Sequence, residues 1–271
     1  MKRTFFYAGI LSMVLLLAAC GKANKNNPNH IKVGVQAGPE YALAQTAQKL
    51  AKEKFGLEVE LIPFNDYIMP NIALDQKDID VNVFQTKPFF EEQVKQRGYT
   101  FVIVGNTFVY PIAAYSRKIK TLDELEDKST IAIPNDISNG SRSLLLLEKA
   151  GLIKLKTRAD NTPRIIDIEE NTRNLRIIEL EAPQLPRVLD DDNVALAVIN
   201  NNFATKAGLL LKDGIIKEEK DSPYVNVIVA REDNKDEEKI KKFVQAYQSE
   251  EVIETAEREF KGGAVAGWVE N

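Results

Sequence analysis

One arginine and three asparagines have the types and positions that could bind a small charged molecule. Asn139 and Arg142 lie at the start of a predicted helix that follows a predicted strand, and Asn200 directly follows another strand. Asn226 lies inside an apolar strand, where a buried carboxamide needs hydrogen-bond partners. A guanidinium binds a carboxylate through two parallel hydrogen bonds, and asparagine oxygens can accept from an ammonium group. These residues therefore predict a site for a zwitterion.

Aromatic side chains follow the predicted strands of the first half of the chain. Tyr67 comes after the second strand, and Phe84, Thr86 and Phe89 surround the end of the third. Aromatic faces can enclose an apolar or thioether side chain, and a sulfur–aromatic contact contributes about 0.3–1.5 kcal/mol. We expect the first half to supply a side-chain pocket, and the second half to bind the charged groups.

These residues also have purely structural interpretations. Asn139 could cap a helix, Asn200 could belong to a turn and cap, and the phenylalanines could be core residues. Arg142 could be a solvated residue of the first helical turn. A positive charge is unfavourable there without an anion, which favours a ligand at Arg142.

The start of the chain carries an export signal. A basic pair and an apolar run at residues 2–17 lead into Leu17-Ala18-Ala19-Cys20, a pattern typical of a secretory signal. It resembles the lipobox of bacterial lipoproteins, in which the cysteine is lipidated and becomes the new N-terminus. An ordinary signal peptide is the alternative. We expect a signal peptide at 1–19, a lipid such as palmitate on Cys20, and a flexible stalk over 20–29.

This arrangement predicts a domain tethered to a membrane in the cell envelope, on the periplasmic side where a cell has two membranes. The apolar run is shorter than the roughly 20 residues that a spanning helix needs. Cys20 is the single cysteine, so we expect neither an internal disulfide nor a cysteine-ligated metal. The net charge is −4, and loss of residues 1–19 would lower it to −6. Nucleic acid is therefore not an expected partner.

The first half alternates strands and helices, which predicts a parallel sheet with helices on both faces. The expected strands are 31–35, 57–62 and 79–84, and the expected helices are 41–55, 70–76 and 89–97. Residues 101–116 form a long apolar segment that is broken near Gly105 and Pro111, as expected for a chain that leaves one lobe and enters another.

A second α/β run follows. Expected strands are 130–133, 175–180 and 194–199, and expected helices are 121–127, 141–150, 184–189 and 203–207. Thr121 and Glu124 have the spacing of a capping box. A strand at 224–230 could return to the first lobe, and a long amphipathic helix over 237–260 is interrupted near Ser249.

These elements predict an α/β protein of two lobes, each with a mixed, mostly parallel sheet flanked by helices. We assign 30–112 plus 228–271 to the first lobe and 113–227 to the second. Ligands of open α/β sheets bind beyond the carboxyl ends of the strands, so we expect the site in the cleft between the lobes.

Catalysis is not expected. The single histidine, His30, lies at the stalk boundary, and the chain lacks the motifs G-x-S-x-G and H-E-x-x-H and a phosphate-binding loop. One histidine and no free cysteine also disfavour a zinc site. We therefore expect neither a cofactor nor a metal.

Seven segments together resemble the NlpA family, the methionine-binding lipoproteins of bacterial ABC importers, over residues 31–268. They are FNDY at 64–67, GNTFVYP at 105–111, PND at 134–136, RSLLLL at 142–147, LEAPQLPR at 180–187, DSPYVN at 221–226 and GGAVAGW at 262–268.

The resemblance implies a periplasmic-binding-protein fold of type II that closes on its ligand and docks, as a monomer, on a permease with its ATPase. It implies that Arg142 binds the ligand's carboxylate and that Asn139, Asn200 and Asn226 make polar contacts. The implied side-chain pocket contains Tyr67, Phe84, Thr86 and Phe89, with Asn202 and Tyr224 as neighbours.

Two positions in the implied pocket depart from the family pattern. The family usually has histidine, then proline and tyrosine, where this chain has Thr86 and Pro88-Phe89. An imidazole donor and a hydroxyl are therefore missing. Methionine is the expected ligand, in its L form and, as an open alternative, its D form. Another amino acid, a methionyl dipeptide, or a surface-antigen role without transport remain alternatives. A second departure, Ile137-Ser138, should affect only a local turn.

Overall fold

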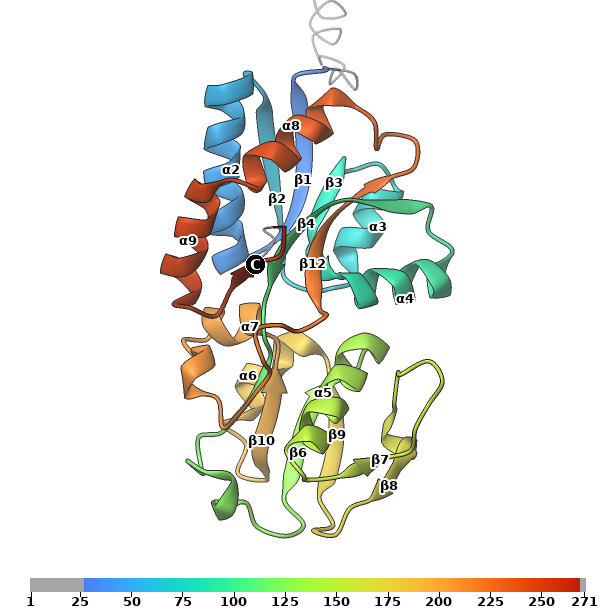
Figure 1. Cartoon of the computed structure of the whole chain (residues 1–271), viewed down its shortest axis with the longest axis vertical. Coiled ribbons are helices and arrows are strands. Elements are labelled where there is room, and N and C mark those ends of the chain that lie inside the picture. The colour runs from blue at the N-terminus through green and yellow to red at the C-terminus, as the bar shows by residue number, and fades with distance from the viewer. Residues whose placement is uncertain (1–26, 269–271) are drawn as a thin grey trace, which may run out of the picture.

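Two mixed β-sheets organise the protein, one in each lobe. The structure is a computed structural model that describes residues 27–268, so the predictions for the signal peptide and for Cys20 lie outside the described residues. The first sheet has the strand order β13-β4-β12-β3-β1-β2, and the second has β11-β5-β10-β6-β9. Figure 1 shows the two lobes one above the other along the long axis, which confirms the predicted two-lobed α/β architecture.

The first sheet follows the predicted βαβαβα run. Its strands are β1 (His30–Gln36), β2 (Glu58–Phe64), β3 (Val81–Thr86), β4 (Phe101–Val109), β12 (Val225–Arg231) and β13 (Val265–Ala266). β1 pairs in parallel with β2 and β3, whereas β12 returns from the second lobe and lies antiparallel between β3 and β4. The predicted return strand is therefore present.

Within residues 27–268, five helices flank this sheet. They are α2 (Pro39–Phe55), α3 (Met69–Asp75), α4 (Lys87–Arg97), α8 (Glu238–Tyr247) and α9 (Glu250–Phe260). In Figure 1, α2, α8 and α9 lie on one side of the sheet, and α3 and α4 lie on the other. The interruption predicted near Ser249 is present: α8 ends at Tyr247, and Ser249 directly precedes α9.

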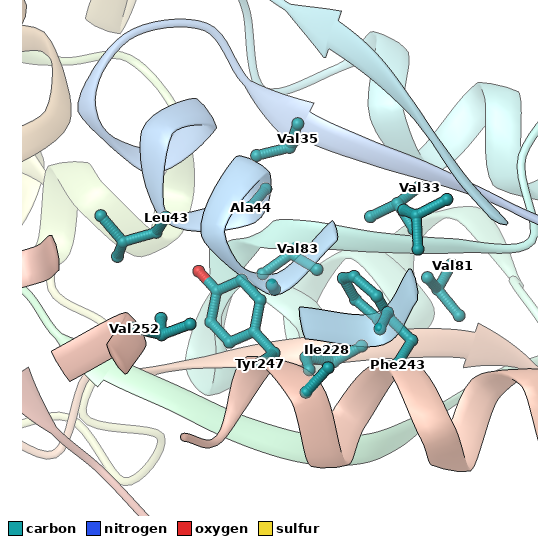
Figure 2. Close-up of a cluster of buried hydrophobic side chains, with 14 of the residues drawn as sticks. Val33, Val35, Leu43, Ala44, Val81, Val83, Ile228, Phe243, Tyr247 and Val252 are labelled. Atoms are coloured by element: carbon teal, nitrogen blue, oxygen red, sulfur yellow. The ribbon is translucent and has the colours of Figure 1, made fainter. Parts of the chain in front are cut away.

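The core of the first lobe forms where α2 and α8 meet the sheet. Val33 and Val35 of β1, Leu43 of α2, and Phe243 and Tyr247 of α8 belong to one buried cluster (Figure 2). The spacing of Leu43, Ala47, Leu50 and Ala51 that predicted α2 is also the buried face of that helix. Burial of each large apolar side chain stabilises the fold by about 1.5–3 kcal/mol.

The second sheet is shorter. Its strands are β5 (Ala113–Tyr115), β6 (Thr130–Pro134), β9 (Arg176–Leu180), β10 (Val194–Ile199) and β11 (Ile216–Lys217). The helices of this lobe are α5 (Ile137–Lys149), α6 (Leu185–Val188) and α7 (Asn201–Lys206). A small antiparallel hairpin, β7 (Lys154–Leu155) and β8 (Ile168–Glu170), lies beside α5 and was not predicted.

The chain passes from one sheet to the other at two places. It leaves the first sheet between β4 and β5 and returns between β11 and β12. This topology places the carboxyl ends of β1, β3, β6 and β10 around the space between the lobes. Among the helices of residues 27–268, none combines the length and apolar character that a bilayer-crossing helix requires.

Two helix predictions were wrong in their extent. The helix expected at 121–127 is a single turn at Leu122–Glu124. The hydroxyl of Thr121 donates to the Glu124 carboxylate at 3.2 Å but makes no capping bond to the helix backbone, so the predicted capping box was wrong. Leu125 turns into an extended conformation, and its side chain is buried in the core. The helix expected at 141–150 begins earlier, at Ile137, because Asp136 rather than Asn139 is its N-cap.

Candidate functional site

A cavity with about 370 Å³ of empty volume lies between the lobes. All eight residues that the sequence singled out as a ligand site line this cavity: Tyr67, Phe84, Thr86, Phe89, Asn139, Arg142, Asn200 and Asn226. Glu40, Gln85, Tyr110, Asn201 and Asn202 complete its lining. The strand ends that the sequence identified therefore converge on one place.

Arg142 is a buried side chain of the second turn of α5, with 3 % of its surface exposed. Its Nε donates to Oε1 of Glu218 at 3.0 Å, and its Nη2 donates to Oε2 of Glu218 and to the carbonyl oxygen of Tyr110, the latter at 3.0 Å. The ring of Tyr224 stacks on the guanidinium, with Cζ 4.2 Å from the ring centroid. The solvated position considered from the sequence is therefore wrong.

Within the described part of the chain, some N–H groups of Arg142 remain free to donate to a ligand. A guanidinium has five N–H groups, and the bonds to Glu218 and Tyr110 use those of Nε and Nη2. Nη1 makes no hydrogen bond within residues 27–268. The edge of the guanidinium at Nη1 can therefore bind a ligand carboxylate while the other edge stays anchored to Glu218.

The carboxamides of Asn139 and Asn200 form a chain at the carboxyl ends of β6 and β10. Nδ2 of Asn200 donates to Oδ1 of Asn139 at 2.8 Å, and Nδ2 of Asn139 donates to both carboxylate oxygens of Asp136. Oδ1 of Asn200 is buried without a hydrogen-bond partner in the described part of the chain. It is therefore an acceptor that a ligand ammonium could satisfy.

Asp136 holds Asn139, the end of this series of hydrogen-bonded side chains, in place. Its carboxylate accepts from the backbone N–H of Asn139 at 2.8 Å, which is the capping contact that starts α5. Burial raises the pKa of Asp136, and the hydrogen bonds from Asn139 act in the opposite direction. The capping role that the sequence offered for Asn139 belongs to Asp136, and the side chain of Asn139 lines the cavity instead.

Asn226 enters the site from the first sheet. It lies in β12 opposite Thr86 of β3, and its Nδ2 donates weakly to the carbonyl oxygen of Phe84 at 3.4 Å. Its side chain is buried, as expected of a carboxamide in an apolar strand. The polar groups of the site therefore come from both sheets.

Aromatic side chains form the other wall. The ring of Tyr67 lies 6.0 Å from the rings of Phe84 and Phe89 and 5.0 Å from that of Phe203, measured between centroids. Phe84 and Phe89 meet edge to face at 6.0 Å. These rings form an apolar wall that suits an unbranched or thioether side chain.

Hydrogen bonds join the lobes at the edge of the cavity, and two of them link the loop after β2 to α7. The hydroxyl of Tyr67 donates to Oδ1 of Asn202 at 2.7 Å, and Nζ of Lys206 donates to Oδ1 of Asn65 at 2.9 Å. Tyr67 and Asn65 follow β2 in the first lobe, whereas Asn202 and Lys206 belong to α7 in the second. The described conformation therefore has the lobes in direct contact.

Thr86 has a structural role where the family pattern has histidine. It is the N-cap of α4, and its Oγ1 accepts from the backbone N–H of Phe89 at 3.3 Å. Threonine is a good capping residue because its hydroxyl satisfies a free N–H of the first turn. Beneath it, Gln85 donates to Asn71 and Asn82, each at 2.9 Å, and this buried network holds the end of β3 in place.

Two acidic residues of the site were missed from the sequence. Glu218 holds Arg142, and Glu40 lines the cavity from the first turn of α2. Glu40 directly follows the turn after β1, so its position at a strand's carboxyl end was a usable signal. Glu218 lies in a charged stretch, and nothing in its local pattern distinguishes it from its neighbours.

The fold and the cavity together define a class of protein. A cavity that opens between two α/β lobes, with a guanidinium on one wall and aromatic rings on another, is that of a two-lobed ligand-binding protein of the periplasmic type. Within residues 27–268 no group of three or more His, Cys, Asp or Glu side chains is placed to hold a metal ion.

The chain belongs to the NlpA lipoprotein family, whose sequence profile matches residues 31–268. It is 61 % identical to the D-methionine-binding lipoprotein MetQ of Salmonella typhi over 267 residues, which cover 98 % of each chain. These matches confirm the family resemblance seen in the sequence.

Solved structures agree in fold. The crystal structure of the methionine-binding protein MetQ superposes with a TM-score of 0.88 and 62 % identity, covering 90 % of this chain and 100 % of that one. A nutrient-binding protein from Burkholderia cenocepacia bound to methionine superposes with a TM-score of 0.85 and 50 % identity, covering 88 % and 99 %. All of these relatives are named as binding proteins, and the one from Salmonella typhi is also named as a lipoprotein.

Proposed function

We propose that this chain is the substrate-binding lipoprotein of an ABC importer, and that it captures methionine and delivers it to a membrane permease with its ATPase. The observation that carries the proposal is the cavity between the lobes, where Arg142 faces a site walled by Tyr67, Phe84 and Phe89. One buried cation and an aromatic wall match the carboxylate and the thioether of methionine.

In the proposed complex the ligand carboxylate binds the Nη1 edge of Arg142. Asn139, Asn200 and Asn226 provide amide groups for the α-amino and carboxylate atoms, and the unpaired oxygen of Asn200 supports that assignment. The thioether lies among the rings of Tyr67, Phe84 and Phe89, next to the methyl group of Thr86. We include D-methionine with L-methionine because the relative from Salmonella typhi is named a D-methionine-binding lipoprotein.

The proposed mechanism is capture by closure. Ligand contacts with both lobes stabilise the closed state relative to the open state. The hydrogen bonds from Tyr67 to Asn202 and from Lys206 to Asn65 join the lobes only when they are close. We propose the expected lobes, 30–112 plus 228–271 and 113–227, except that Val225–Val227 join the first lobe, because β12 begins at Val225 and pairs with the first sheet.

We propose further that Cys20 carries the lipid that anchors the protein to the envelope membrane, and that the protein acts as a monomer without catalytic activity. The names of its relatives as lipoproteins support the anchor. Anchoring raises the local concentration of the binding protein at the permease.

Isothermal titration calorimetry with L- and D-methionine, other amino acids and methionyl dipeptides tests the proposal. We expect methionine to bind most tightly. Tightest binding of another amino acid or of a dipeptide would keep the transport role and assign the change to Thr86 and Phe89. Binding of none of them would contradict transport and favour a surface-antigen role.

Arg142→Lys tests the carboxylate contact without removing the charge that faces Glu218. A single lysine ammonium cannot bind both oxygens of Glu218 and also reach a ligand carboxylate, as the separate nitrogens of the guanidinium can. We expect affinity to fall by about 2 kcal/mol or more, roughly thirtyfold. Arg164→Lys, at an exposed position outside the cavity, is the matched control. Unchanged affinity in Arg142→Lys would refute the role of Arg142.

A further inference from the structure

Glu40 is the one carboxyl group among the described residues that line the cavity. It is buried, with 4 % of its surface exposed, and its Oε2 has no hydrogen-bond partner within residues 27–268. A buried acceptor without a partner is costly, and in a native structure it calls for an explanation. A ligand donor that enters the cavity would provide one.

The backbone around Glu40 is fixed, so its carboxyl group is held at the cavity. Gly38 precedes α2 with a φ of 119°, and the backbone N–H of Tyr41 donates to its carbonyl oxygen at 3.0 Å. The N–H of Ala37 donates to the carbonyl oxygen of Phe64 at 2.8 Å, which ties the turn to β2. Pro39 at the start of α2 restricts the turn further.

The groups around Glu40 do not neutralise it. Burial and the Glu40 carboxylate both raise the pKa of Tyr67, Tyr110 and Tyr247, which approach it from the β2–α3 loop, the end of β4 and α8. The cations and acids of the second lobe are paired elsewhere, as the contacts of Arg142 with Glu218, Asp136 with Asn139, and Lys206 with Asn65 show.

We propose that Glu40 accepts a hydrogen bond from the α-ammonium group of the ligand and so selects ligands with a free primary amine. This inference rests on the proposed function, since it concerns the same cavity. Arg142 and Glu40 lie on opposite lobes, α5 and α2, so a zwitterion places one charge against each. A ligand with both charges therefore bridges the lobes electrostatically.

The proposal has a thermodynamic consequence. Desolvation by burial raises the pKa of Glu40 from 4.5 to about 8, so in the empty site at pH 7 about nine-tenths of the molecules carry a proton there. An ammonium group beside the carboxylate favours its ionised form. The neutral acid then loses its proton to solvent as the ammonium binds, and binding at pH 7 releases about 0.9 proton per ligand.

Isothermal titration calorimetry of the full chain in detergent, with L-methionine at pH 7, can count that proton. The buffer takes up the released proton, and phosphate and Tris differ in their enthalpy of ionisation. The difference in apparent binding enthalpy between the two buffers therefore gives the number of protons released. We expect close to one proton released by the wild type. Glu40→Gln should release none and should bind at least tenfold more weakly. Glu53→Gln, an exposed position on the same helix, is the matched control.

The α-hydroxy analogue of methionine, in which a hydroxyl replaces the amine, gives a readout that needs no variant. The wild type should bind it at least tenfold more weakly than methionine and release no proton. Methionine binding by the wild type without proton release, or a Glu40→Gln variant with unchanged affinity, would overturn the role of Glu40 alone. Absence of binding for every amino acid would instead overturn the proposed function, and this inference with it.

Discussion

The carboxylate of Glu218 pairs with one edge of the Arg142 guanidinium: Nε donates to Oε1 at 3.0 Å, and Nη2 donates to Oε2. The same carboxylate accepts from the backbone N–H of Ile112 at 3.2 Å, in the segment where the chain crosses between the lobes. Glu218 therefore ties the proposed carboxylate-binding residue to the crossing. It orients Arg142, and it supplies the counter-charge that a buried cation requires.

Glu218→Gln should destabilise the empty protein. The variant leaves Arg142 buried without a counter-charge, and breaking a buried ion pair in this way costs about 3–5 kcal/mol. We expect a clearly lower midpoint of urea unfolding. The neighbouring Glu219→Gln is the control, because Glu219 and Lys149 form an exposed pair at 3.6 Å. Equal midpoints for the two variants would show that the buried pair is not stabilising.

Tyr67→Phe should weaken ligand binding without unfolding the protein. It deletes the 2.7 Å hydrogen bond to Asn202 that joins the lobes but keeps the ring in the aromatic wall. Loss of one such bond costs about 1 kcal/mol, so we expect about a fivefold loss of affinity by calorimetry. Tyr99→Phe, whose ring stacks on Phe101 away from the cavity, should bind like the wild type. A Tyr67→Phe variant with full affinity would contradict a role for this bond in closure.

Stability of the empty protein should respond to pH through Glu40. Its pKa is raised to about 8 in the folded state, so the folded protein keeps a proton at pH values where the unfolded chain, with a pKa near 4.5, has lost it. Stability therefore falls as the pH rises from about 4.5 to about 8. By pH 7 this effect is about 3 kcal/mol, and Glu40→Gln removes it.

Urea unfolding of the wild type and of Glu40→Gln at pH 4.5 and pH 7 measures this difference. The variant should gain stability relative to the wild type between the two pH values. A constant difference would mean that Glu40 has the same pKa in the folded and unfolded states.

Thr86→Ala should destabilise the first lobe modestly. The hydroxyl of Thr86 caps α4 through the N–H of Phe89, and loss of such a cap costs about 1 kcal/mol. Thr86→Ser keeps the hydroxyl and should retain most of the stability. Thermal unfolding compares the two, and equal losses in both variants would exclude the capping role.

Much of the fold could be predicted because its signals are local. The spacing of Leu43, Ala47 and Leu50 predicted helix α2, and Gly56 ends this helix in a left-handed conformation with a φ of 63°. The break at Ser249 was visible as an interruption of the amphipathic pattern. The helix expected at 121–127 is only one turn long, because Thr121 does not cap it and the burial of Leu125 favours an extended conformation there.

The site residues with local signals could also be predicted, whereas their partners in the tertiary structure could not. Residues such as Arg142 and Asn200 follow strands of a predictable sheet, and the strand ends brought them together. The partners of these residues could not be predicted, because Glu218 meets Arg142 from 76 positions away through the path of the second crossing. Capping by Asp136 also depended on where α5 starts, and the sequence left that open by several residues.

Native mass spectrometry of the purified protein, followed by denaturation and identification of any released small molecule, would show whether the protein binds methionine. We expect the released molecule to be methionine, unchanged, at one per chain. A protein that releases no small molecule, and that binds neither L- nor D-methionine when these are then added, would contradict it.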